Sequence, residues 1–315
     1  MLKLKDCIGE YKTIAVAGMC KNAGKTTVVN HIVREYCHTH KIGLTSIGYD
    51  GEEFDEITQL EKPRIDVYPG MIIATCTSCL EKAGAGYKII RGTGINTILG
   101  EIQIAEVTSD GFLEVSGPSV VSQIEELCLH FERLGCDKSI VDGAAGRLSF
   151  ASNLDCMILA VGGALGPAIT SVAKRAKHLV ELLDIPEYSG NPLPEANKSG
   201  NYETSECEDL VTVVFKGAVT DDDLKEIIKK YKGYSKLVVV NNSASLFLSQ
   251  KIYRKFLHRN GEICVKKKTN LVAVTINPMS PYGKWFDKEE FLKEMQSNIN
   301  IPVINVLDEE ASLVQ

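Results

Sequence analysis

The chain has 315 residues, 44% of them hydrophobic, which suggests about two domains, although one wound α/β sheet with an insertion can also reach this length. Lysine and arginine total 35 against 41 aspartates and glutamates, and the net charge of -6 offers no general attraction for nucleic acid or anionic lipid. The longest uncharged apolar stretch, Cys156 to Ile169, is interrupted by glycines and a proline and is too short to span a bilayer. From the net charge and from this stretch together, we expect neither a nucleic-acid nor a membrane partner.

The amino terminus and the cysteines predict a cytoplasmic protein. Residues 1 to 6 lack the apolar core of a secretory signal, and the ten cysteines do not have the spacing of a small disulfide-linked domain. Cys76 and Cys79 form the one Cys-x-x-Cys pair, but no second pair or nearby histidine completes four metal ligands. We therefore expect free thiols and no role for this pair beyond packing.

The first predicted strand and helix enclose a glycine-bounded turn. Residues 13 to 17 have the apolar pattern of a buried strand, the turn runs from Gly18 to Gly24, and the chain after it has helical apolar spacing. A polyphosphate needs backbone N–H donors without bulky Cβ atoms, a cation for its β and γ groups, and a hydroxyl for Mg²⁺, at the positive end of a helix. Gly24, Lys25 and Thr26 would fill these roles in order.

The sequence therefore predicts a phosphate-binding loop for ATP with Mg²⁺. Five residues separate Gly18 from Gly24 where the strict pattern has four, and Met19 stands where its first glycine would be. The strand before the turn and the helix after it favour the loop in spite of this mismatch. The alternative is a tight turn with a solvent-facing lysine. The residues predicted to bind the nucleotide here are Asn22, Ala23, Gly24, Lys25, Thr26 and Thr27.

Two aspartates follow further predicted strands. Residues 42 to 48 predict a second strand, followed by Asp50, and a short apolar strand from Ser139 leads to Asp142. An aspartate at the carboxyl end of a neighbouring parallel strand can hold Mg²⁺, directly or through water, opposite a phosphate loop. We predict that Thr26 and Asp142 bind the metal and that Lys25, Asp142 and Asp50 act in catalysis. The alternative at Asp142 is an ordinary Asp-Gly turn.

Residues 71–117 predict a β-rich insertion or a sheet edge. Glu101 to Val107 alternate with period two, Asp110-Gly111 is a hairpin turn signal, and Phe112 to Val115 would form the returning strand. A helix is expected next, from Pro118 to about Leu134. This organisation assigns residues 1–70 and 118–185 to a nucleotide-binding core.

The remainder of the chain alternates strands and helices. A strand at 156–161 and a helix at 168–183 precede residues 186–206, whose Pro, Asn, Ser and Gly content predicts a surface linker. Repeated strand–helix units favour an α/β fold with a mostly parallel sheet and helices on both faces, which 207–315 would continue. In this last part we predict strands at 210–215, 237–240, 271–276 and 303–306 and helices near 221–231, 246–258 and 287–297.

Ligands of such sheets lie beyond the carboxyl ends of the strands. The loops expected to gather there with the phosphate loop are Asp50-Gly51, Asp142-Gly143, Gly162-Gly163, Lys216-Gly217, Asn241-Asn242 and Asn277-Pro278. The sequence contains no Asn-Lys-x-Asp motif for guanine, so ATP is the expected nucleotide. Asn277 could offer its side-chain amide to an adenine edge, or it could serve only to begin a turn.

With these motifs the chain resembles P-loop NTPases of the signal-recognition, MinD and BioD class. The five-residue spacing from Gly18 to Gly24 is similar to the dethiobiotin synthetase loop in particular. MinD relatives carry a second lysine five positions before the loop lysine, which reaches the partner subunit's phosphates across a dimer. Cys20 occupies that position here and Lys21 follows it, so the resemblance allows a homodimer but does not imply the lysine mechanism.

A narrower resemblance covers most of the chain. It is similar to the small reactivase subunit of adenosylcobalamin-dependent lysine 5,6-aminomutase and ornithine aminomutase through residues 19–27, 49–52, 69–72, 141–144 and 277–281. The resemblance implies ATP-driven exchange of damaged cobalamin from an inactivated aminomutase, with a MutS-like ATPase as partner. Two other functions stay open: a ligase of the dethiobiotin synthetase kind, with Lys62, Arg64 or Arg147 on a carboxylate substrate, and a nucleotide-bound scaffold or sensor with negligible turnover.

Overall fold

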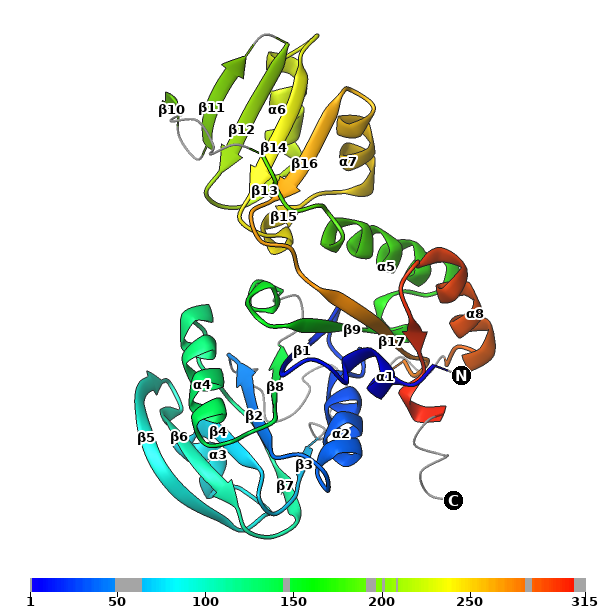
Figure 1. The fold of residues 1–315 in the computed structure, drawn as a ribbon. Coiled ribbons are helices and arrows are strands. Elements are labelled where there is room, and N and C mark those ends of the chain that lie inside the picture. Colours follow the sequence, from blue (N-terminus) through cyan, green and yellow to red (C-terminus); the bar gives the residue numbers. More distant parts are fainter. Residues whose placement is uncertain are drawn as a thin grey trace. The chain divides into compact units, whose positions relative to one another are not determined.

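The computed structural model describes residues 2–48, 64–143, 148–190, 197–199, 202–207, 209–280 and 285–308 (Figure 1). The chain divides into two compact units: the first comprises Met1–Ala176 with Leu271–Gln315, and the second comprises Lys177–Asn270. Each unit has a sheet and a hydrophobic core of its own. No helix within the described ranges combines the length and the apolar character needed to cross a membrane.

The first unit is built on a nine-stranded sheet. Its strands are β1 (Thr13–Gly18), β2 (Ile42–Ile47), β4 (Ile72–Cys76), β5 (Tyr87–Thr97), β6 (Gly100–Val107), β8 (Lys138–Gly143), β9 (Cys156–Gly162), β17 (Leu271–Asn277) and β18 (Val303–Ile304). Their order is β18-β17-β9-β1-β8-β2-β4-β6-β5. All neighbours from β18 to β4 pair in parallel, and only β6 and β5 are antiparallel. The predicted mostly parallel α/β sheet is confirmed.

Helices cover both faces of this sheet. The helices of the unit are α1 (Leu4–Ile8), α2 (Lys25–Tyr36), α3 (Thr77–Glu81), α4 (Val121–Arg133), the first half of α5 (Ile169–Leu183) and α8 (Lys288–Asn298). Along β4, Ile73 belongs to the apolar cluster that includes α2, whereas its neighbours Ile72 and Ala74 belong to the cluster that includes α4. Because successive side chains of a strand point to opposite faces, α2 and α4 pack on opposite sides of the sheet.

Residues 71–117 form the antiparallel edge of the sheet. The hairpin predicted at Asp110-Gly111 is wrong, because β6 already pairs with β4 on one side and β5 on the other. The chain after this turn, β7 (Gly111–Leu113), pairs instead with β3 (Ile65–Val67). The hairpin of this region joins β5 to β6, and Gly100 provides the left-handed residue at its turn with φ 101°.

The second unit contains a separate five-stranded sheet. Its strands are β10 (Asn197–Ser199), β11 (Tyr202–Cys207), β12 (Leu210–Phe215), β14 (Ser235–Val240) and β16 (Gly261–Val265), in the order β10-β11-β12-β14-β16. The last three are parallel to one another, and β10 and β11 are antiparallel additions. Two helices, α6 (Asp221–Lys230) and α7 (Gln250–Leu257), and a short parallel pair, β13 (Val219–Thr220) with β15 (Leu246–Phe247), complete the unit.

Two sequence predictions fail in this unit. Residues 207–315 do not all continue the first sheet: β12, β14 and β16 pair only within the second sheet, and β17 and β18 return to the first. Residues 186–206 are not simply a linker, because β10 and most of β11 lie there and pair into the second sheet. The cause is a closed apolar core in which strand residues such as Val213 and Val238 share a cluster with Leu224 and Phe256 of the helices.

Candidate functional site

The glycine-bounded turn joins β1 to α2 at the carboxyl edge of the first sheet. Its backbone enters the left-handed region at Asn22, with φ 60°, and at Gly24, with φ 96°. Gly24 is the N-cap of α2 and provides no side-chain cap, and the first turn of the helix carries no acidic residue. The N–H groups at this helix start therefore lack the side-chain acceptor that usually satisfies them, as an anion-binding helix start requires.

Lys25 folds back across the start of the turn. A Cβ atom at Gly18 would lie 2.8 Å from Lys25 Cγ and 3.0 Å from Lys25 Cδ, so the glycine provides the space that the lysine stem occupies. The stem is thereby fixed against the end of β1. The arrangement places a cation and the uncapped helix start on the same loop.

Asp142 lies on the strand next to the turn. It is paired in register with Val16 of β1, so β8 brings this carboxylate to the edge of the sheet from which the turn departs. Its Oδ1 atom is shielded from solvent. Asp142 thus lies near the carboxyl end of β8, next to β1, and the end of β1 leads through the turn to Lys25 at the start of α2.

Asn277 braces the turn from the end of β17. Its Nδ2 atom donates to Asn22 O at 3.4 Å, and its Oδ1 atom accepts from Met279 N at 3.1 Å. A Cβ atom at Gly24 would lie 3.0 Å from Asn277 Cβ, so this contact also requires glycine at position 24. Asn277 therefore positions the loop, a role that sequence reasoning missed. The bond to Asn22 uses one of the two N–H groups of Nδ2.

Gly162 and Arg175 contribute to the surroundings of the turn. A Cβ atom at Gly162 would lie 2.8 Å from Ala23 Cα, so the end of β9 packs directly on the loop backbone. Burial raises the pKa of the Cys20 thiol, while the charges of Lys25 and then Arg175 act to lower it. Arg175, which donates to the Leu165 carbonyl, thus adds a second positive charge near the loop.

The metal-binding capacity of the site is limited to hard oxygen ligands. In the described ranges no three or more His, Cys, Asp or Glu side chains gather as a metal cluster. Thr26, in the first turn of α2, and Asp142 offer one hydroxyl and one carboxylate. That set fits Mg²⁺, which keeps several waters and takes its other ligands from phosphate oxygens. The residues present therefore fit the ion that the sequence predicts.

The other residues predicted for the site either fall outside the described ranges or belong to other parts of the structure. Asp50, Lys62 and Arg147 fall outside the described residues. The guanidinium of Arg64 lies 4.3 Å from the centre of the Phe112 ring, in a cation–π contact. Lys216-Gly217 and Asn241-Asn242 follow β12 and β14, so they belong to the second sheet and not to the sheet that carries the phosphate loop. The expectation that all these loops follow strands of one sheet is therefore wrong.

The Cys-x-x-Cys pair is part of the core. Cys76 and Cys79 are both buried, and the Sγ atom of Cys76 lies 3.1 Å from Thr97 Oγ1. All ten cysteines are free thiols.

No protein-family model, curated protein or solved structure matches this chain.

Proposed function

We propose that this protein binds ATP with Mg²⁺ at the loop from Gly18 to Thr27 and hydrolyses it. The observation that carries the proposal is the position of Lys25, folded over Gly18 at the uncapped start of α2, with Asp142 near the end of the strand next to β1. A strand, a glycine-bounded turn and an uncapped helix start together supply N–H donors and a cation in one place.

Each residue has a defined part in the proposal. The backbone N–H groups of Asn22 to Thr27 bind the phosphates, and the Lys25 ammonium balances charge on the β and γ groups. Thr26 and Asp142 hold Mg²⁺ from two sides, with Asp50 acting on water or metal. Bound Mg²⁺ supplies charge neutralisation for phosphoryl transfer. Asn277 fixes the loop and offers its amide to the base.

In this proposal ATP hydrolysis drives the remodelling of a partner protein and does not form a covalent bond in a small substrate. The resemblance to the aminomutase reactivase supports cofactor exchange on a cobalamin-dependent aminomutase together with a MutS-like ATPase. The sheet edge also supports a protein partner, because β5 exposes 51% of Ile89 and the turn after it exposes 92% of Ile98. Arg64, the one described cation nominated for a ligase substrate, is stacked on Phe112 instead.

The first experiment tests the site through Asp142→Asn. We expect this variant to lose turnover, because the amide no longer offers a negative charge to Mg²⁺. ATP affinity, measured by calorimetry, should change little, because no hydrogen-bond donor to the phosphates is removed. Asp137→Asn is a matched control just before the same strand, where the carboxylate accepts from Lys41 N at 2.8 Å. Parent-like hydrolysis in Asp142→Asn across Mg²⁺ concentrations would remove Asp142 from the mechanism.

A second experiment tests the accessory role. A nucleotide shifts a binding equilibrium only through different affinities for the two states, so partner binding must differ between ATP and ADP. Binding to inactivated aminomutase with the MutS-like subunit, and cobalamin release, would be measured in each nucleotide state. Equal affinities with no cofactor release would discard the reactivase proposal and leave the nucleotide site intact.

A further inference from the structure

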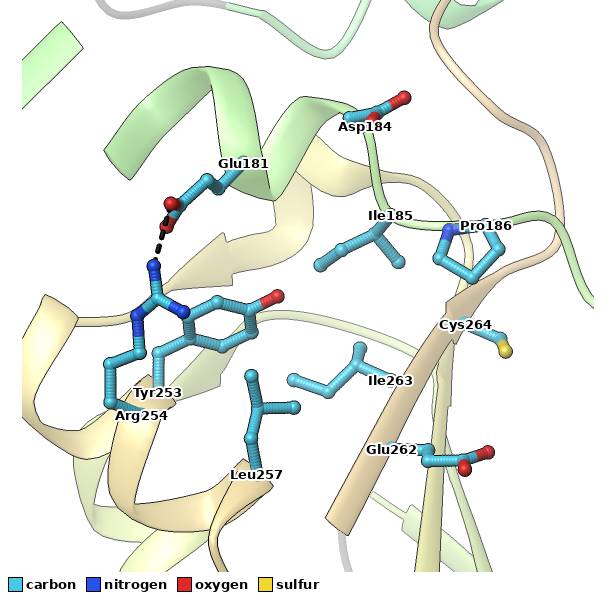
Figure 2. Close-up of a pocket in the computed structure, with 10 residues that line it drawn as sticks. All are labelled: Glu181, Asp184, Ile185, Pro186, Tyr253, Arg254, Leu257, Glu262, Ile263 and Cys264. Atoms are coloured by element: carbon cyan, nitrogen blue, oxygen red, sulfur yellow. Dashed lines mark hydrogen bonds and ion pairs between the residues drawn. The ribbon is translucent and has the colours of Figure 1, made fainter. Parts of the chain in front are cut away.

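The second unit contains a cavity of about 410 Å³ that no part of the nucleotide proposal uses. It lies between the end of α5, one face of α7 and the edge strand β16, all within residues 177–270 (Figure 2). Ile185, Leu257 and Ile263 point into it and form an apolar part of its lining, which also includes charged side chains. A volume of this size, with apolar side chains and a few polar groups, is typical of small-molecule sites.

Pro186 explains why the cavity exists. The segment after α5 pairs with the outer edge of β16 at one point only: Val265 N donates to Pro186 O at 3.0 Å, and Tyr188 N donates to Val265 O at 2.7 Å. Continuing this parallel ladder by one step would require an N–H at position 186 for the Ile263 carbonyl. Proline has no N–H group, so the backbone pairing between this segment and β16 ends, and the cavity remains beside Ile263.

Tyr253 provides a polar atom inside the cavity. Only 9% of its surface is exposed, and Figure 2 shows its hydroxyl pointing into the cavity between Ile185 and Ile263. The described ranges provide no hydrogen-bond partner for this hydroxyl. Burial raises the pKa of Tyr253, which keeps the hydroxyl neutral and able both to donate and to accept. The hydroxyl oxygen is not among the solvent-shielded polar atoms of the described residues, so a ligand in the cavity can reach it.

Charges around the cavity select the sign of that ligand. Its lining includes three carboxylates, Glu181, Asp184 and Glu262, against one guanidinium, Arg254. Glu181 neutralises Arg254 through an ion pair of 2.6 Å, and Asp184 pairs with Lys268 at 2.8 Å. Glu262 is exposed at the rim. With these two ion pairs neutral, the exposed Glu262 carboxylate leaves one negative charge at the rim, which favours a cation and disfavours an anion.

We propose that this cavity binds a small organic cation, an ammonium or guanidinium group on a short apolar chain. The chain packs against Ile185, Leu257 and Ile263, and N–H groups of the ligand reach the Tyr253 hydroxyl and the carboxylates of the rim. The proposal concerns the second unit alone and does not depend on nucleotide binding.

The test compares three probes that share a six-carbon chain: hexylammonium, 1-hexanol and hexanoate. Each is titrated into the full-length protein and followed by amide chemical shifts, which also identify the residues that respond. We expect hexylammonium to bind tightest and hexanoate weakest, with shifts centred on Tyr253 and Ile263. Equal affinities for the three probes, or shifts centred elsewhere, would overturn the proposal.

Two variants with matched controls locate the site. Tyr253→Phe removes only the hydroxyl and should weaken hexylammonium binding about threefold to tenfold, whereas Tyr234→Phe, at a 38% exposed tyrosine, should not. Glu262→Gln should weaken it about twofold to fivefold, while Asp209→Asn makes the same charge change at an exposed position outside the lining. Parent-like affinity in both Tyr253→Phe and Glu262→Gln would contradict the assignment.

A lysine derivative distinguishes a free ligand from a protein side chain. Nα-acetyl-lysine amide carries the same kind of alkylammonium on a peptide group. Binding no tighter than that of hexylammonium supports a small-molecule site. Markedly tighter binding would indicate that the cavity takes a lysine from a protein segment, and would overturn the small-molecule proposal.

Discussion

Helix α2 of the first unit and helix α6 of the second begin in opposite ways, although each follows a parallel strand. In the first, α2 follows a parallel strand and starts at Gly24 with no side-chain cap and no acidic residue in its first turn. In the second, α6 starts at Thr220, whose hydroxyl accepts from Asp223 N while the Asp223 carboxylate accepts from Thr220 N at 2.7 Å. Three aspartates occupy the first turn of α6. One helix start is left open and the other is filled by its own side chains.

An open start alone does not mark a site, because α4 also begins without a side-chain cap or a first-turn acid, but at α2 the open start coincides with the glycine-bounded turn and Lys25. A side-chain cap is worth about 1 kcal/mol, and an acid in the first turn typically adds about 0.3 to 1 kcal/mol. The start of α2 has neither a side-chain cap nor an acidic residue in its first turn. Its N–H groups and the positive end of its dipole can therefore bind an anion. Departures from local stabilisation of this kind are expected at functional positions.

The largest predicted effect is that of Lys25→Ala on ATP binding. The ammonium should bind the β and γ phosphates, and we expect its loss to cost about as much as one charge-assisted bond, roughly 1.5 to 3 kcal/mol, so that the Kd rises about 10- to 150-fold. Calorimetry on folded protein measures it. Lys216→Ala, after β12 in the second unit, is the comparison, because Lys216 is held by Glu203 at 2.7 Å and should not affect ATP. Unchanged affinity in Lys25→Ala would exclude the phosphate-loop interpretation.

Alkaline pH should destabilise the first unit through its buried thiols. Burial raises the pKa of Cys128 and of Cys156 from 9.0 to about 12. Between these values the unfolded chain has lost the thiol protons that the folded chain retains, so the free energy of unfolding falls as pH rises. Going from pH 8 to pH 10 should cost about 1.4 kcal/mol for each thiol.

Urea unfolding at pH 8, 9 and 10 measures this slope. Cys128→Ala should reduce the slope although it lowers stability overall, because one titrating thiol is gone. Cys207→Ala is the matched control in the second unit, where the cysteine is exposed. An identical pH slope in the parent and Cys128→Ala would show that buried thiols do not cause the alkaline loss.

Local pattern was sufficient for most elements of the fold. The strand predicted at 210–215 is confirmed as β12 at the same residues, and the helix predicted at 221–231 is α6, Asp221–Lys230. The partition into two sheets could not be predicted, because strand–helix alternation does not specify which sheet a strand enters. The short strand β16 was missed, since Gly261–Val265 contains glutamate and cysteine among few apolar residues.

The candidate site was predictable only in part. Spacing and residue type were enough to nominate Lys25 and Asp142, and the position of Asp142 next to β1 follows from the parallel order of β8 and β1. The bracing contact of Asn277 on Asn22 joins residues 255 positions apart, and no local signal indicates it. The Tyr253 cavity likewise depends on where Pro186 meets β16, which is a property of the folded chain.

The smallest predicted effect is the loss of the α6 cap in Thr220→Ala. Removing the hydroxyl leaves Asp223 N without its acceptor and takes one of two donors from the Asp223 carboxylate, which still accepts from the backbone N–H of residue 220. We therefore expect the second unit to lose about 1 kcal/mol of stability. Thr220→Ser keeps the hydroxyl and should change stability much less. Urea unfolding gives the magnitude, and amide exchange of α6 shows whether the loss is local. ATP affinity should not change, because the capped helix start does not belong to the nucleotide site. Equal destabilisation by alanine and serine would mean that the methyl group of Thr220, and not its cap, stabilises this junction, and the contrast with Gly24 would then lose its energetic basis.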